Sequence, residues 1–127
     1  MTRTTFRALL ALAATTAVAL VLAATALSRS HATPTLTGTV GPGFTIKLTL
    51  NNKVVKTLKA GTYKLVIHDM ASIHAFSLDG PKGYAKDFTT VPFVGTKTFT
   101  VNLKPGAYKY YCPAHEPSMF GHFAATK

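Results

Sequence analysis

The chain has 127 residues, a formal net charge of +10 at pH 7 and one cysteine. A single cysteine excludes an intramolecular disulfide, so Cys112 is a reactive thiol, half of an intermolecular bridge or a metal ligand. The arginines all lie within residues 1–32, and the rest of the basic residues are lysines, without the stacked aromatics of a nucleic-acid groove. We therefore expect no nucleic-acid partner and favour a solvated basic face. An acidic protein partner or contact with an anionic membrane surface is the alternative.

The N-terminal segment has the layout of a secretory signal peptide. Arg3 and Arg7 precede an uncharged run over residues 8–27, and the small-x-small sequence Ser30-His31-Ala32 follows as a cleavage site. The run is long enough to span a bilayer, but nine of its 20 residues are alanine, which makes it weakly hydrophobic for an anchor. We predict that residues 1–32 are a signal peptide, with an uncleaved membrane anchor as the alternative. Residues 33–127 would then form one exported domain in the periplasm or outside the cell.

The rest of the sequence has the period of β-strands. Apolar and polar residues alternate over residues 44–50 and 99–103, and glycine and proline turns separate the runs. Between these runs, Tyr63, Leu65 and Ile67 alternate with Lys64 and His68. In the first run, Phe44 and Ile46 are expected on the core face. No sustained helical period follows residue 32, so we predict an all-β protein, an antiparallel β-sandwich.

One seven-residue pattern occurs twice. The segment Leu58-Lys59-Ala60-Gly61-Thr62-Tyr63-Lys64 has a counterpart in Leu103-Lys104-Pro105-Gly106-Ala107-Tyr108-Lys109. In each copy a strand ends in leucine, a glycine turn follows, and a new strand begins with tyrosine and lysine on opposite faces. We interpret the pattern as a repeated corner of the sandwich and not as a duplicated module.

The residues with metal-binding chemistry are concentrated in Cys112-Pro113-Ala114-His115-Glu116-Pro117-Ser118-Met119. This loop offers a thiolate, an imidazole and a thioether directly after a strand-like run. Two imidazoles and one thiolate, with a weak axial thioether, are the ligands of an electron-transfer copper site, and His74 is the best candidate for the second imidazole. We therefore expect one copper ion per chain, held by His74, Cys112, His115 and Met119.

Strand parity supports this set. Cys112 has the parity of the apolar Tyr110, and His74 has that of Phe76, so both side chains are expected on the core side. Met119 also falls on the core side of the last predicted strand. His115 lies in a loop, where parity does not apply.

With these residues the chain resembles the cupredoxins, the small blue copper proteins such as plastocyanin, amicyanin and azurin. The resemblance covers about residues 35–126 and rests on the His-x-Phe sequence and on the Cys-x-x-His-x-x-x-Met loop that follows a Pro-Gly-x-Tyr-x-Tyr strand. It implies a Greek-key sandwich with type 1 copper at one end, bound by His74, Cys112 and His115 with Met119 axial. It also implies transfer of single electrons between larger redox proteins.

Two positions differ from familiar members of that family. Many members have asparagine directly after the first histidine ligand, where it ties the ligand loops together by hydrogen bonds, and this chain has Ala75. Plastocyanin and amicyanin have proline two residues after the cysteine ligand, and this chain has Ala114. We expect the Ala114 N–H to donate a hydrogen bond to the Cys112 sulfur.

Other metal sites are less favoured. Zinc could occupy the same residues, but structural zinc sites take four strong ligands and methionine is a poor one. His68 and Asp69 are adjacent, yet a strand-end histidine facing solvent is the simpler interpretation of the first. His122 is also expected to be exposed.

The expected function is that of a monomeric, exported one-electron carrier. Its redox partner would dock on an apolar surface around His115, ringed by Pro113, Pro117, Met119 and Phe120. Copper storage, delivery or tolerance without a redox partner is the alternative. An enzyme is not expected, because the chain has no second histidine cluster for a catalytic copper centre.

Overall fold

The computed structural model describes residues 31–127, so the predicted signal peptide lies almost wholly outside the described residues. The described strands are β1 (Thr35–Val40), β2 (Ile46–Leu50), β3 (Lys53–Val54), β4 (Thr57–Lys59), β5 (Gly61–Asp69), β6 (Ser77–Asp79), β7 (Ala85–Asp87), β8 (Gly95–Leu103), β9 (Gly106–Tyr111) and β10 (Phe120–Thr126). Two short 3-10 helices join them, η1 (Pro81–Gly83) and η2 (Pro113–His115). None of the helices in this part of the chain is long and apolar enough to span a membrane.

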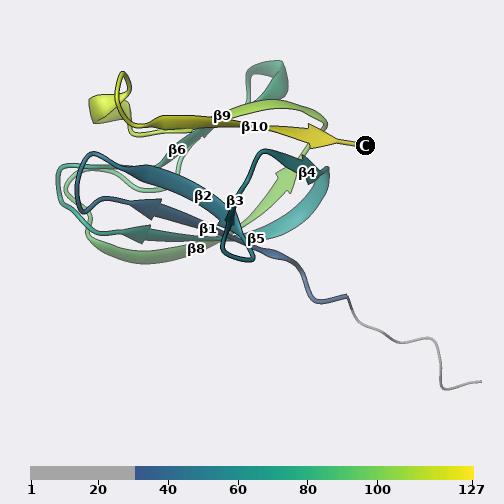
Figure 1. The fold of residues 1–127 in the computed structure, drawn as a ribbon, viewed down its shortest axis with the longest axis horizontal. Coiled ribbons are helices and arrows are strands. Elements are labelled where there is room, and N and C mark those ends of the chain that lie inside the picture. The colour runs from purple at the N-terminus through teal and green to yellow at the C-terminus, as the bar shows by residue number, and fades with distance from the viewer. Residues whose placement is uncertain (1–30) are drawn as a thin grey trace, which may run out of the picture. The chain divides into compact units, whose positions relative to one another are not determined.

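The strands form two five-stranded sheets, in the orders β3-β2-β1-β5-β8 and β4-β10-β9-β6-β7 (Figure 1). The predicted all-β sandwich is confirmed. Each sheet also contains one parallel pair, β1 with β5 and β4 with β10, so the sheets are mixed and not purely antiparallel. The parallel pairing arises because the chain crosses into the second sheet at β4 and then returns to the first as β5, running in the direction of β1.

The period of two predicted from the sequence appears in the burial of the strands. In β5, Tyr63, Leu65 and Ile67 are buried, whereas Lys64 and His68 on the opposite face are exposed. The inward side chains of both sheets form one apolar core, and aromatic rings stack within it, among them Tyr108 on Phe123 with centroids 4.9 Å apart. Burial of this apolar surface is the main stabilising term for the fold.

The repeated seven-residue pattern folds as two tyrosine corners. The Tyr63 hydroxyl donates a hydrogen bond to the carbonyl of Lys59 at 2.8 Å, and the Tyr108 hydroxyl donates to the carbonyl of Lys104 at 2.9 Å. Such a bond from a tyrosine to the backbone a few residues upstream is a known feature of β-sandwich corners. The glycine at each turn has a positive φ, 146° for Gly61 and 149° for its counterpart, which favours glycine over other residues.

Four loops meet at one end of the sandwich. Val40 at the end of β1 pairs with Ile46 and with Asp69, and Asp69 pairs with Gly95, so the β1–β2, β5–β6 and β7–β8 loops meet at the same end of the first sheet. Tyr111 at the end of β9 pairs with Phe120, which brings the β9–β10 loop to the same end from the second sheet. Figure 1 shows this loop, with η2, at the left end, away from the C-terminus.

Candidate metal centre

The β9–β10 loop is folded tightly on itself. Cys112 directly follows β9, and its N–H donates to the carbonyl of Met119 at 2.9 Å. Within the loop, the His115 N–H donates to the Cys112 carbonyl at 3.1 Å, and the Met119 N–H donates to the His115 carbonyl at 2.9 Å. These bonds fix the backbone that carries three of the four residues singled out from the sequence.

His74 comes from a loop and not from a strand. The predicted alternation around it is wrong, because residues 74–78 are all buried, and His74 lies between β5 and β6. A turn orients it, in which its N–H donates to the carbonyl of Ala71 at 3.1 Å. Gly41 of the β1–β2 loop packs close by, and a Cβ at that position would lie 3.5 Å from Cδ2 of His74. The segment is therefore covered on both sides, which is why burial there does not alternate.

Three side chains from these two loops converge. Nδ1 of His74 lies 3.1 Å from Nδ1 of His115, and Sγ of Cys112 lies 4.0 Å and 3.7 Å from the same two nitrogens. Two imidazole nitrogens that each bond one ion at about 2.0 Å lie about 3 to 3.5 Å apart. The three donor atoms therefore have the spacing that a shared metal ion requires, and one thiolate with two imidazoles is the donor set of a mononuclear electron-transfer copper site.

Burial is graded across the cluster. His74 and Cys112 are fully buried, whereas His115 is partly exposed. Nε2 of His74 is buried without a hydrogen-bond partner among residues 31–127, so Nδ1 is the nitrogen of this ring that meets other donor atoms. The arrangement leaves His115 as the one member of the cluster that reaches the surface.

Met119 closes the loop and belongs to the apolar core. Its side chain is fully buried, directly before β10, and its backbone is bonded to both Cys112 and His115. This burial contradicts the expectation that Met119 forms part of an exposed patch around His115, whereas Pro113 and Pro117 of the same loop are exposed. The methionine is held inside because it has the inward parity of Phe123 in the strand that follows.

The sulfur of Cys112 accepts a hydrogen bond from a different alanine than the one predicted. The donor is the N–H of Ala75, at 3.4 Å, and the bond links the β5–β6 loop to the β9–β10 loop. No such bond joins Ala114 to the sulfur in the described part of the chain, and Ala114 lies exposed in η2. The prediction failed because it considered donors within the cysteine loop alone.

Phe44 is a member of this end of the molecule that the sequence did not reveal. It was expected on the core face of a strand, but β2 begins two residues later and the side chain is 59% exposed. Its ring contacts His115 edge to face, with centroids 4.9 Å apart, and His74 at 5.4 Å. The preceding Gly41-Pro42-Gly43 sequence was the signal that the chain is still turning at this point.

Exposed apolar side chains gather at the same end. Seven large ones are exposed in the described part of the chain: Phe44, Val54, Met70, Ile73, Val91, Val94 and Phe120. All except Val54 lie in or beside the four loops at this end of the sandwich, among them the β7–β8 loop, which ends at Gly95 opposite Asp69. An apolar surface of this kind on a small protein is typical of an interaction site.

The remaining histidines of the described strands lie on the surface. His68 is exposed as predicted, and its Nδ1 lies 2.9 Å from the Thr96 hydroxyl, whereas the neighbouring Asp69 points into the protein. His122 is exposed, also as predicted, and its ring packs on Phe120. Within residues 31–127, neither histidine belongs to a group of side chains that could hold a metal ion.

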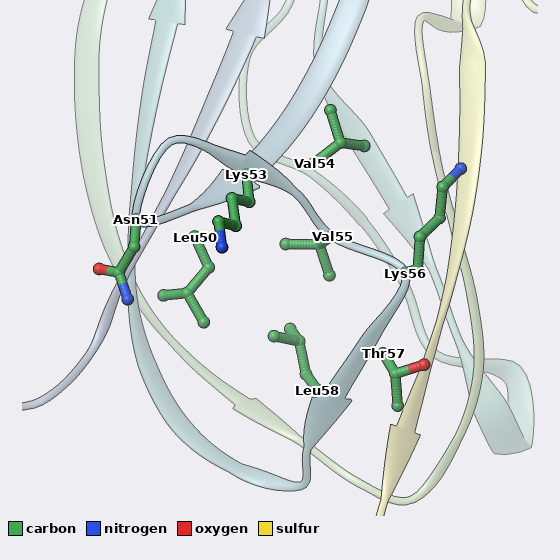
Figure 2. A pocket seen from close by; sticks show the side chains of 8 residues that line it. All are labelled: Leu50, Asn51, Lys53, Val54, Val55, Lys56, Thr57 and Leu58. Carbon is green, nitrogen blue, oxygen red and sulfur yellow. The ribbon is translucent and has the colours of Figure 1, made fainter.

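A shallow hollow lies elsewhere, between β2 and β4 (Figure 2). Its lining residues are Leu50, Asn51, Lys53, Val54, Val55, Lys56, Thr57 and Leu58. It contains no histidine, cysteine or carboxylate, so it offers none of the usual metal ligands.

Solved structures of rusticyanin are similar to this chain, while neither a family model nor a curated protein sequence matches it. A structure of rusticyanin described as a copper protein has a TM-score of 0.53 at 19% identity, over 72% of this chain and 76% of that one. Reduced rusticyanin has a TM-score of 0.53 at 20% identity, over 72% of this chain and 78% of that one. Rusticyanin from Thiobacillus ferrooxidans has a TM-score of 0.50 at 21% identity, over 72% of this chain and 76% of that one. At these identities the likeness establishes the fold, which is that of the cupredoxins.

Proposed function

We propose that this chain, which has the cupredoxin fold, is a mononuclear type 1 copper protein that carries single electrons. The observation that carries the proposal is the convergence of two imidazole Nδ1 atoms and one thiolate, from loops on both sheets, within 4.8 Å of one another. Rusticyanin, whose fold the chain shares, is a copper protein. We also propose that the chain is exported and that cleavage leaves an N-terminus near Thr33.

In this proposal His74, Cys112 and His115 would hold the ion, and Met119 would be a fourth, weaker donor. When bound, copper would provide the redox chemistry, accepting one electron from a donor protein as Cu(II) and passing it to an acceptor protein as Cu(I). The protein keeps the ligands in nearly one geometry, since the backbone hydrogen bonds of the cysteine loop and the buried turn before His74 leave little freedom. A rigid ligand set suits electron transfer because little rearrangement accompanies each change of charge.

The partner would be another redox protein that docks on the apolar end of the molecule. His115 is the partly exposed ligand there, and the exposed Phe44, Ile73 and Phe120 lie on segments of the same end. The excess of lysine favours an acidic partner, whose association would slow as salt screens the attraction. Contact with an anionic membrane surface is compatible with the same charge.

The experiment is a titration of the purified metal-free domain with Cu(II), followed by visible absorption. The proposal predicts one copper per chain and an intense charge-transfer band from the Cys112 thiolate. Cys112→Ser should lose the band, because a hydroxyl is a harder and poorer donor for copper. Absence of a visible band in the folded wild-type domain, or an equal preference for zinc with the same stoichiometry, would refute the copper assignment.

A further inference from the structure

We propose that Asp69 and Thr89 are positioning residues for the metal centre. Through a buried chain of hydrogen bonds they hold the backbone of residues 74–76 in place. This keeps the Ala75 N–H in position to donate its hydrogen bond to the Cys112 sulfur. Neither residue contacts the three donor atoms, and neither belongs to the ligand loop around the cysteine. The inference rests on the proposed copper function and adds two residues that position the site through the backbone without binding the metal.

The chain of bonds runs from the end of β5 to the segment that follows His74. The Thr89 hydroxyl donates to Oδ2 of Asp69 at 2.8 Å, and the same oxygen of Thr89 accepts the N–H of Phe76 at 2.9 Å. The other oxygen of Asp69, Oδ1, accepts the N–H of Ala71 at 3.4 Å, in the turn that orients His74. Asp69 and Thr89 thus contact the His74 segment at both of its ends.

Both side chains are buried, Asp69 to 2% exposure and Thr89 to 1%. A buried carboxyl is costly unless its hydrogen bonds are made, so its position at the inner face of a sandwich implies a specific role or a specific partner. The threonine hydroxyl has one proton, which it gives to Asp69, and this leaves its lone pairs directed at the Phe76 N–H. The acidic residue therefore sets the direction of the whole chain, and each bond polarises the next.

Three consecutive residues connect this chain to the metal centre. His74 offers Nδ1, Ala75 donates its N–H to the Cys112 sulfur, and the N–H of Phe76 is held by Thr89. The carbonyl of Phe76 is held as well, by the N–H of Phe88 at 2.8 Å. Because each peptide unit is planar, fixing the backbone at Phe76 limits how far the preceding N–H can turn away from the sulfur.

Because residue 75 is alanine, the site depends on this chain of hydrogen bonds. A methyl side chain cannot form the hydrogen bonds that an asparagine at this place would offer to the other ligand loop, so in this chain the backbone N–H is the link. A hydrogen bond to the thiolate withdraws charge from the sulfur and favours the reduced site. If the hydrogen bonds of Asp69 and Thr89 are lost, the bond from the Ala75 N–H to the sulfur should weaken. Both the reduction potential and the energy of the charge-transfer band should then fall.

The test compares Thr89→Val, which keeps the shape of the side chain and removes the hydroxyl, with Thr89→Ser, which keeps the hydroxyl. Thr89→Val should still bind one copper per chain, but with a lower reduction potential and a charge-transfer band at longer wavelength. Thr89→Ser should match the wild type in both. Thr49→Val removes a hydroxyl that, among the described residues, donates to the carbonyl of Thr37 on the first sheet, and it should change neither the potential nor the band.

Asp69→Asn provides a second approach if Thr89→Val does not fold. It keeps an acceptor for the threonine but weakens it, so the band should move in the same direction by a smaller amount. The band is the appropriate readout for this variant, because removing a negative charge raises the potential by itself. A wild-type potential and band in folded Thr89→Val, or equal changes in Thr89→Ser, would overturn the inference. A wild-type protein without any band would instead refute the proposed function.

Discussion

The rings of Phe44 and His115 pack edge to face, with centroids 4.9 Å apart and an angle of 88° between the planes. The phenylalanine comes from the β1–β2 loop and the histidine from the β9–β10 loop, so the contact joins the two sheets above the cluster of donor atoms. Phe44 is nevertheless more than half exposed. A large apolar side chain in this position shields part of His115, the proposed ligand that reaches the surface.

Phe44→Ala should therefore change the metal site far more than the fold. Substitutions at exposed positions usually alter the free energy of unfolding by about 0.5 kcal/mol or less. Transfer of copper to a chelator should become faster, because His115 loses the ring that shields it. The matched control is Val54→Ala, an exposed apolar residue outside this end, which should leave the release rate unchanged. Equal release rates in both variants and the wild type would show that the contact has no shielding role.

Met119→Leu should retain copper and shift the reduction potential. The thioether is the weakest of the four proposed ligands, so the other three suffice to hold the ion. Leucine has a similar volume and fills the same buried space, and such swaps usually cost less than about 1.5 kcal/mol of stability. Copper stoichiometry and cyclic voltammetry on the same preparation measure both effects. Loss of copper binding in a folded variant would show that the methionine is more than an axial ligand.

The two tyrosine corners predict unequal costs for the same substitution. Tyr63→Phe removes one bond, to the Lys59 carbonyl, whereas Tyr108→Phe removes two, because the Tyr108 hydroxyl also accepts the N–H of Lys104 at 2.8 Å. A hydrogen bond contributes about 1 kcal/mol net, so we expect a loss of about 1 kcal/mol for the first variant and about 2 kcal/mol for the second. Urea denaturation of the metal-free domain measures the difference. A reversed order would contradict the corner geometry.

The stability of the metal-free domain should fall at high pH. Burial raises the pKa of Tyr84 above its ordinary value, and the nearby Tyr108 raises it further. Burial also raises the pKa of Tyr108, against the lowering effect of its bond with the Lys104 backbone. Above about pH 10 these tyrosines lose their protons in the unfolded chain before they do so in the folded one, so the unfolded state binds fewer protons and stability decreases as pH rises.

Melting temperatures measured from about pH 9 to about pH 11 check this expectation. Tyr84→Phe cannot ionise at this position, so its melting temperature should fall less steeply than that of the wild type. The difference between the two slopes measures the contribution of the Tyr84 hydroxyl alone. Parallel slopes would contradict the raised pKa.

The parts of the structure that could be predicted are those that depend on local sequence. Alternation along β5 and β8 follows from which side chains are apolar, and the Cys112 to Met119 loop keeps its three metal-binding side chains within one short segment. The tyrosine corners were predictable for the same reason, because the hydroxyl reaches a carbonyl only four residues upstream.

The parts that could not be predicted depend on contacts between distant segments. The parity of His74 gave no information, because residues 74–78 are all buried, and Gly41 of the distant β1–β2 loop packs close to His74. The donor to the cysteine sulfur comes from a loop 37 residues away in sequence. The burial of Asp69 could have been predicted, since it has the parity of the buried Leu65 and Ile67. Nothing in the local sequence indicated that its hydrogen-bond donor would be Thr89.

Redox cycling of the copper form in the presence of a Cu(I) chelator tests the proposed carrier most directly. A carrier must keep its ion in both oxidation states, whereas a protein that stores or delivers copper must release it readily from one of them. The ligands here come from loops held by backbone hydrogen bonds, so we expect reduction and reoxidation to be fast and nearly all the copper to remain after many cycles. Release of most of the copper on the first reduction would contradict the carrier function and favour delivery.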